Sequence, residues 1–300
     1  QQMPEQNFGH VVIIGVGLIG GSLARALKQH KAASKITGVA RSHETLDLAK
    51  QLGVIDQAET DPVVAVRDAD LVVLATPVST IGALLTSIST QLPEHCVITD
   101  AGSVKGSVVK AARKALGDTI GSFIPGHPIA GTENSGVAAS IAELFIDHRV
   151  ILTPLEENSE RDIHRVQAMW ELCGARVVRM SITEHDAILA ATSHLPHLLA
   201  FSLVDFLSQQ DQHEEIFANT AGGFRDFTRI AASSPVMWRD ICLANRDELI
   251  PLLESMEQTL AGYRKLLQKA NGEQLEQSFR RAKTARDQLR EINKAGDKDA

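Results

Sequence analysis

Short apolar runs separated by helix-length segments fill the first half of the chain. The first run, residues 11–14, enters the glycine-rich stretch 15–21, after which Leu23, Ala26 and Leu27 recur at helical spacing. This order predicts a strand, a tight turn and a helix. Similar apolar runs follow at residues 36–40, 71–75 and 97–99. Runs that are apolar on both faces and alternate with helices are typical of a parallel sheet covered by helices on both sides.

The second half of the chain is predicted to be mostly helical. Two last apolar runs, 149–152 and 175–178, flank a helical segment at 160–172 and are predicted to extend the same sheet. From about residue 181 onward, helical periodicity replaces the β-branched runs. One apolar stripe of the charged C-terminal segment contains Leu275, Phe279, Ala282 and Leu289. An exposed apolar stripe needs a partner, so we expect a homodimer.

The glycine-rich stretch has the GxGxxG pattern of Gly15, Gly17 and Gly20, placed between a strand and a helix as dinucleotide binding requires. The glycines permit the turn, the approach of a pyrophosphate and close packing of helix on strand. Glycines that serve only the turn and packing are the alternative. Besides these glycines, the residues expected to contact the cofactor are Leu18, Ile19, Thr76 and Ser103.

The end of the second predicted strand distinguishes NAD from NADP. An NAD-specific site usually places an acidic residue there to bind the ribose hydroxyls. This chain has Arg41 and Ser42 instead, which can pair with a 2′-phosphate and donate a hydrogen bond to it. We therefore favour NADP, with NAD possible if Arg41 is only a solvated loop residue.

These patterns predict an α/β Rossmann-like dinucleotide-binding domain over residues 1–180, followed by an all-α helical substrate and dimerisation domain over 181–300. At 300 residues the chain exceeds the ~250 at which single cores usually stop growing. Hydrophobic residues make up 44% and charged residues 22%, as in ordinary folded proteins.

The net charge of −7 argues against nucleic-acid or anionic-membrane partners, which require clustered cations. An anionic substrate would need local arginines.

The three cysteines indicate neither a disulfide framework nor a zinc site, because Cys96, Cys173 and Cys242 are far apart and lack CxxC spacing. We expect buried free thiols. The first ten residues lack the pattern of a signal peptide, and no apolar run approaches ~18 residues. We therefore expect no membrane span and a cytoplasmic location.

Four segments go beyond a generic dinucleotide-binding fold: residues 100–105 (DAGSVK), 126–133 (GHPIAGTE), 193–197 (SHLPH) and 222–229 (GGFRDFTR). In this order they resemble the motif set of prephenate and arogenate (cyclohexadienyl) dehydrogenases. The resemblance runs from near residue 10 to beyond Trp238. It implies an NAD(P)-dependent oxidative decarboxylation of tyrosine biosynthesis. The product would be 4-hydroxyphenylpyruvate from prephenate or tyrosine from arogenate.

His127 is the expected catalytic residue. It lies on a rigid Gly–His–Pro loop where the strand ends face the cofactor, and its imidazole can accept a hydrogen bond from a substrate hydroxyl as hydride leaves. Local sequence alone also fits a structural histidine. The resemblance implies that Ser103 orients His127 near the nicotinamide, whereas its local alternative is to cap a helix from Val104. Lys105 is either a first-turn residue or a contact to cofactor phosphate.

The segment 222–229 supplies candidate cations. Arg225 and Arg229 lie four residues apart and would share one face of a helix. The resemblance implies that Arg229 clamps the ring carboxylate and that Asp226 positions it. A solvated Arg–Asp surface network is the alternative. Glu133 is a weaker candidate for the cavity.

The histidines around Pro196 are placed near a helix start. His194 and His197 lack a third ligand of suitable spacing, so we expect them to line the substrate cavity and no metal to bind. His185 is as easily structural as functional, and Trp238 is expected to pack.

Two other functions remain open from the sequence. One is another two-domain dehydrogenase of the β-hydroxyacid type, but no glycine-framed lysine stands in the helical half. The other is a catalytically inactive NAD(P)-sensing protein that keeps the fold. The presence of Ser103, His127 and Arg229 together argues against loss of the chemistry.

Overall fold

The structure is a computed structural model that describes residues 6–296, apart from the side chains of residues 290, 291 and 293–296. The strands are β1 (His10–Ile14), β2 (Lys35–Val39), β3 (Gln57–Glu59), β4 (Leu71–Leu74), β5 (Val97–Asp100), β6 (Phe123–Ile124), β7 (Gly126–Pro128), β8 (Arg149–Leu152) and β9 (Arg176–Arg179). The α-helices up to the last strand are α1 (Leu18–Gln29), α2 (His43–Gln51), α3 (Pro62–Ala65), α4 (Ile81–Ile88), α5 (Gly106–Leu116) and α6 (Glu160–Leu172).

The chain after β9 is helical, as predicted. Its helices are α7 (Ile182–Leu189), α8 (Leu195–Ser208), α9 (His213–Ala218), α10 (Gly222–Thr228), α11 (Pro235–Ala244), α12 (Arg246–Gln268) and α13 (Gly272–Gly296). A π-helical segment η4 (Ala190–His194) joins α7 to α8. The short 3-10 segments are η1 (Val78–Thr80), η2 (Gly117–Ser122), η3 (Val137–Ala139) and η5 (Arg229–Ala232).

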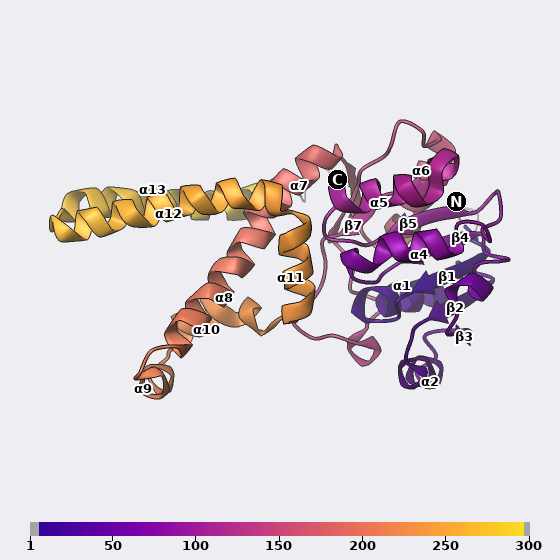
Figure 1. The fold of residues 1–300 in the computed structure, drawn as a ribbon, viewed down its shortest axis with the longest axis horizontal. Coiled ribbons are helices and arrows are strands. Elements are labelled where there is room, and N and C mark those ends of the chain that lie inside the picture. The colour runs from indigo at the N-terminus through magenta and orange to yellow at the C-terminus, as the bar shows by residue number, and fades with distance from the viewer. Residues whose placement is uncertain (1–5, 297–300) are drawn as a thin grey trace. The chain divides into compact units, whose positions relative to one another are not determined.

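The first six strands form one parallel sheet in the order β3-β2-β1-β4-β5-β6 (Figure 1). The predicted Rossmann-like fold is confirmed. The chain builds outward from β1 through β2 to β3, then returns to the other side of β1 and continues through β4 and β5. Strand order therefore reverses between β1 and β4, and ligands of such sheets bind outside the carboxyl ends at this switch point.

Alternating residues of the sheet belong to two separate cores. In β1, Val11 and Ile13 pack with α1, α2 and α6, whereas Val12 and Ile14 pack with α3, α4 and α5. All four side chains are buried, as expected for a strand covered on both faces. The sheet is thus the middle of three layers. Because helices cover both of its faces, a ligand can reach it only at the edge where the strands end.

The last two strands do not extend this sheet, and that prediction is wrong. β8 pairs antiparallel with β7 and parallel with β9, which makes a second sheet of three strands in the order β7-β8-β9. Pro125, between β6 and β7, has no N–H to donate to a ladder. Its carbonyl accepts from Thr153 N at 3.0 Å instead, so the chain leaves β5 at this point and pairs with β8.

Helices α7 and α8 run on through η4 as one stretch, Ile182–Ser208. Within this stretch α8 begins at Leu195 with Pro196 in its first turn, as the sequence predicted. Proline lacks an N–H for the regular helical bond, and the wider π turn accommodates its place in the stretch. The consequence for function is that η4 directs the His194 side chain into the interior, where it is buried.

The same stretch corrects the expectation about apolar segments. It contains an 18-residue window with a mean hydropathy of 1.5, of which 22% is buried, so it is long and apolar enough to cross a membrane by length and composition. Because polar residues interrupt this stretch, it does not form an uninterrupted apolar run in the sequence. Packing inside a protein or against another chain produces the same composition.

The described chain divides into two compact units, one up to Arg246 and one from Asp247. The first contains the sheets and α1 to α11. In the second, which comprises most of α12 together with α13, Tyr263 and Phe279 stack with ring centroids 5.8 Å apart. This unit leaves several large apolar side chains exposed, namely Ile250, Leu260, Leu267, Phe279, Leu289 and Ile292.

The packing of α1 on β1 gives a prediction of stability. A Cβ at Gly20 would stand 2.0 Å from the carbonyl oxygen of Gly15, whereas a Cβ at Gly17 would meet nothing within 4 Å. Gly20→Ala should therefore lower the free energy of unfolding by about 1–3 kcal/mol. Gly17→Ala, the matched control, should change it by no more than about 1 kcal/mol. Urea denaturation of the ligand-free protein measures both, and equal effects would contradict the packing argument.

Candidate functional site

The turn after β1 is shaped for a dinucleotide phosphate. Gly15 has φ +99°, which favours glycine, and Gly20 lets the first turn of α1 rest on the backbone of Gly15. Gly17 precedes α1 and faces open space, so a ligand can approach its backbone. Leu18 and Ile19 follow, half-buried. The positive end of the α1 dipole and its unpaired N–H groups favour an anion at this point.

The other predicted cofactor residues follow neighbouring strands of the sheet. Arg41 and Ser42 are exposed between β2 and α2, and the Ser42 hydroxyl caps α2 by accepting from Thr45 N at 3.2 Å. Thr76 follows β4 and its hydroxyl accepts from Thr80 Oγ1 at 2.8 Å. These positions lie beyond the carboxyl ends of parallel strands that flank the switch point. The residues present therefore fit an NAD(P) cofactor.

A buried ion pair holds the loop after β5 against the start of β7. Lys105 Nζ lies 2.5 Å from Asp100 Oδ2 and 2.5 Å from the carbonyl oxygen of Gly126, and both side chains are fully buried. The other carboxylate oxygen of Asp100 accepts from Gly126 N at 3.1 Å. Lys105 is thus inside the protein, and the suggestion that it meets cofactor phosphate is wrong. The pair fixes the backbone immediately before His127.

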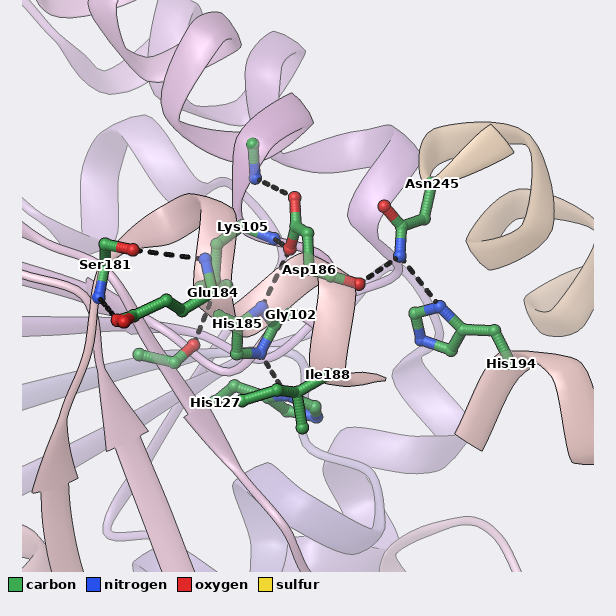
Figure 2. A network of polar contacts seen from close by, with 12 residues as sticks. Gly102, Lys105, His127, Ser181, Glu184, His185, Asp186, Ile188, His194 and Asn245 are labelled. Atoms are coloured by element: carbon green, nitrogen blue, oxygen red, sulfur yellow. Dashed lines mark hydrogen bonds and ion pairs between the residues drawn. The ribbon is translucent and has the colours of Figure 1, made fainter. Parts of the chain in front are cut away.

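His127 lies on β7 in a chain of three buried polar side chains (Figure 2). Its Nδ1 is 2.8 Å from Nε2 of His185, whose Nδ1 is 2.7 Å from Oδ1 of Asp186. The backbone N–H groups of Lys105 and Gly106 donate to the two oxygens of Asp186 at 2.9 and 2.8 Å. His127 Nε2 has no hydrogen-bond partner in the described residues and keeps exposed surface.

Burial sets the charge states in this chain. Desolvation, with contributions from His185, Lys105 and His194, holds the pKa of His127 well below 6.5, so its ring is neutral at neutral pH. Burial acts to raise the pKa of Asp186, but the hydrogen bonds from His185, Lys105 and Gly106 outweigh it and the pKa is lowered. A neutral imidazole and a fixed carboxylate are the states that a proton acceptor needs.

Ser103 lies half-buried between β5 and α5, two residues before Lys105, whose backbone N–H donates to Asp186. Helix α5 begins at Gly106 with no side-chain cap of its own, so the alternative that Ser103 caps a helix from Val104 is wrong. The carboxylate of Asp186 caps α5 instead. Within the described residues, no hydrogen bond joins Ser103 to His127, and His185 takes the orienting contact. A contact of Ser103 with cofactor or substrate stays a prediction.

His194, His197 and Trp238 form a second group beside this chain. His194 is buried, and its Nδ1 is 3.0 Å from Asn245 Nδ2, which also donates to the backbone oxygen of Asp186 (Figure 2). The His197 ring stacks on Trp238 with centroids 3.6 Å apart. Two buried nitrogens of this group, His194 Nε2 and Trp238 Nε1, have no hydrogen-bond partner among residues 6–296. Orphaned buried donors are costly, which makes them candidate contacts for a ligand.

The predicted cations are arranged differently from the sequence expectation. Helix α10 ends at Thr228, so Arg225 lies in α10 and Arg229 opens the following η5. Arg229 pairs with Glu133, with NH1 to Oε2 at 3.2 Å, and not with Asp226. Both partners are exposed, as are Arg225 and Asp226, which make no side-chain bond to the described residues.

Electrostatic interactions connect these groups into one site. The ring of His194 and the ammonium of Lys105 contribute to the lowered pKa of His127. Burial, with His185, lowers the pKa of His194 to about 4. Burial and the charge of Arg229 lower the pKa of His197. Among the described residues no cluster of His, Cys, Asp and Glu can hold a metal ion.

The sequence did not single out Asp186 and Asn245, and it gave His185 only as a weaker candidate. Trp238 packs as predicted, in a buried cluster with Val104 and Ile241. The adjacent Glu184, His185 and Asp186 are polar residues in an otherwise apolar helix, which was the available signal. Their partners are 58 to 81 residues away along the chain, so no local pattern shows the contacts.

Two family models together cover most of the chain. One, described as prephenate dehydrogenase, nucleotide-binding domain, matches residues 23–179. The other, described as prephenate dehydrogenase, dimerization domain, matches residues 181–281. Their junction coincides with the change from mixed to helical structure after β9.

Individual relatives match nearly the full length. The chain is 40% identical to a cyclohexadienyl dehydrogenase of Zymomonas mobilis over 281 residues, covering 93% of this chain and 95% of the relative. A crystal structure of Aquifex aeolicus prephenate dehydrogenase with hydroxyphenyl propionate and NAD+ is similar at a TM-score of 0.88 and 37% identity, covering 96% and 100%. Synechocystis arogenate dehydrogenase is similar at a TM-score of 0.77 and 25% identity, covering 93% and 99%.

The burial of His127 predicts its titration. Because its pKa is held well below 6.5, the ring should remain neutral at pH 6.5, where a free imidazole is half protonated. The unfolded chain then binds more protons than the folded one below pH 6.5, so this group makes stability fall as pH falls. A ¹⁵N NMR titration of the histidine rings, with His127→Gln for assignment, measures the effect. Half-protonation at pH 6.5 or above would contradict it.

Proposed function

The chain belongs to the prephenate dehydrogenase family, and we propose that it catalyses the oxidative decarboxylation of prephenate, of arogenate, or of both, in tyrosine biosynthesis. The observation that carries the proposal is His127, a neutral buried imidazole whose Nε2 has no partner in the described residues, on the strand β7 that Asp100 joins to the carboxyl end of β5. Such a group can accept a proton where a dinucleotide-binding sheet places its ligand.

In the proposed reaction, the proton of the ring hydroxyl passes to His127 Nε2 while the hydrogen on the same carbon leaves with its electron pair. An NAD(P)+ bound at the glycine loop supplies the acceptor for that hydride. The carbon becomes a carbonyl, and the ring carboxylate then leaves as carbon dioxide. Its bonding electrons complete the aromatic ring, and the ring oxygen takes the proton back from His127. The half-buried Ser103 hydroxyl is proposed to contact the cofactor or the reacting oxygen.

Cofactor preference follows from the loop after β2. No acidic residue stands at the end of β2, and the exposed Arg41 and Ser42 can bind a 2′-phosphate. We propose that the chain prefers NADP+ and also accepts NAD+. The proposed backbone contacts are those of Gly15, Gly17, Leu18, Ile19 and Gly20, with Thr76 completing the set.

The substrate is doubly anionic, and Arg229 is proposed to bind its ring carboxylate in a bidentate pair. The Glu133 pair must then open or rearrange, which is inexpensive because both side chains are exposed. Arg225 and Asp226 are proposed to contact the substrate from farther out, on the side of its ring carboxylate. The orphaned donors His194 Nε2 and Trp238 Nε1, with His197 stacked on the indole, are proposed to receive the pyruvyl or alanyl side chain.

The second copy of the chain is proposed to cover the exposed apolar helices. The half from residue 181 matches a dimerization-domain model, and its apolar stretch Ile182–Ser208 is only 22% buried in the window measured. We propose the domain boundary near residue 180 and a homodimer formed through this half. The cytoplasmic location and the absence of nucleic-acid and membrane partners stay predictions. An inactive cofactor sensor, the remaining alternative, would bind NAD(P) without turnover.

Steady-state kinetics test the proposed reaction. The wild-type protein should reduce NADP+ or NAD+ with prephenate or arogenate, and His127→Asn should lower kcat by about 10²–10⁴ because the proton acceptor is lost. Cofactor binding, measured by quenching of protein fluorescence, should stay the same in both. No turnover with either substrate and either cofactor would rule the function out, and a near-normal rate in the variant would exclude His127 as acceptor.

Arg229→Ala should mainly weaken substrate binding, by ~2–5 kcal/mol, because the ring carboxylate loses its cation. KM should rise far more than kcat falls. The matched comparison is Arg225→Ala, which removes an exposed cation four residues away and should have a smaller effect. An unchanged KM for Arg229→Ala would show that another cation holds the carboxylate.

A further inference from the structure

The contacts behind His127 form a single line of hydrogen bonds that ends on a charge. His127 Nδ1 meets His185 Nε2 at 2.8 Å, and His185 Nδ1 meets Asp186 Oδ1 at 2.7 Å (Figure 2). His185 is fully buried and Asp186 nearly so. The two imidazole rings lie edge to face, with centroids 5.1 Å apart and planes at 71°.

The direction of both bonds follows from the carboxylate. An ionised carboxylate only accepts hydrogen bonds, so His185 must carry its proton on Nδ1. Whenever His185 carries only this one ring proton, its Nε2 has a lone pair, which must accept from His127. His127 therefore carries its proton on Nδ1, and its Nε2 has the lone pair. This is the nitrogen without a partner in the described residues, so the line of bonds leaves it ready to accept a proton.

Asp186 is held so that it cannot act as the donor. Its Oδ1 also accepts from Lys105 N at 2.9 Å, and its Oδ2 accepts from Gly106 N at 2.8 Å. These two N–H groups open α5, which has no side-chain cap of its own and whose dipole favours a negative charge there. If Asp186 were protonated, its O–H hydrogen would compete with the backbone N–H groups that donate to its oxygens. The helix therefore keeps the carboxylate ionised and fixes both of its oxygens.

We propose that Asp186 and His185 are positioning residues that hold His127 in the tautomer with a free Nε2 and stabilise the imidazolium formed when that atom takes a proton. The role of the proton acceptor rests on the proposed function, whereas the tautomer does not depend on it. When Nε2 is protonated, the positive charge on His127 is shared along the hydrogen bonds toward the carboxylate of Asp186. The ammonium of the buried Lys105 forms its ion pair with Asp100.

Substitutions at His185 separate this role from a packing role. Glutamine can accept from His127 with Oε1 and donate to Asp186 with its amide, so His185→Gln keeps the direction of both bonds. His185→Leu fills similar space but removes both bonds. Asp186→Asn keeps the shape of the carboxylate but introduces a donor that must face His185 or a backbone N–H, and so favours the opposite direction.

The tautomer of His127 is the first measurement, made on the full-length protein without substrate by ¹⁵N NMR of labelled histidine, with His127→Gln for assignment. The wild type and His185→Gln should show Nδ1 protonated and Nε2 unprotonated. His185→Leu and Asp186→Asn should show a mixture of tautomers or the reverse one. Nε2 protonated in the neutral wild-type ring would overturn the proposal, and this result needs no variant to fold.

Kinetics are the second measurement. His185→Leu and Asp186→Asn should lower kcat on the order of 10²-fold with KM changed less than about threefold, and His185→Gln should recover most of that loss. If His185→Leu folds and keeps both the tautomer and kcat, the proposal is wrong. If the wild type turns over neither prephenate nor arogenate, the proposed function fails, while the tautomer measurement still decides the positioning role.

Discussion

The carboxylate of Asp186 accepts three hydrogen bonds where α7 packs against the start of α5, and the geometry of the site depends on them. Two come from backbone N–H groups of α5 and one from His185. A helix without a cap of its own thereby receives one from a residue 80 positions later in the sequence. Since Asp186 belongs to the helical half and α5 to the sheet half, the same bonds join the two parts that form the site.

A second buried charge pair acts on the other side of His127. Lys105 and Asp100 are completely buried, and their contacts to Gly126 fix the strand β7 on which His127 lies. Removing either partner would leave an uncompensated charge inside the protein, so loss of one of the two residues is strongly destabilising. The imidazole is thus held from its backbone by one ion pair and from its ring by another carboxylate. Such double support is what a catalytic group needs to keep one orientation.

The fold was predictable wherever packing forces a repeating pattern. The runs at β1, β2, β4 and β5 are apolar on both faces because both faces are covered, and periodicity alone located them. The short strands β3, β6 and β7 have two or three residues each, too few to show a period. β8 and β9 were recognised as strands but assigned to the wrong sheet. Pairing depends on where Pro125 turns the chain, a contact between distant residues that no local pattern records.

By itself, the sequence determined the parallel Rossmann-like sheet, the glycine loop and the helical second half, because each lies in a local pattern of spacing. It also singled out His127 and Arg229 as candidate site residues, through the resemblance of their segments to the family's motifs. The tertiary structure alone decided which groups meet: Glu133 with Arg229, His185 with His127, and Asp186 with the backbone N–H groups that open α5. The physical reason is that hydrogen-bond partners are selected by distance in space and by burial. Residues separated by 58 to 96 positions in the sequence come close in space only when the chain folds.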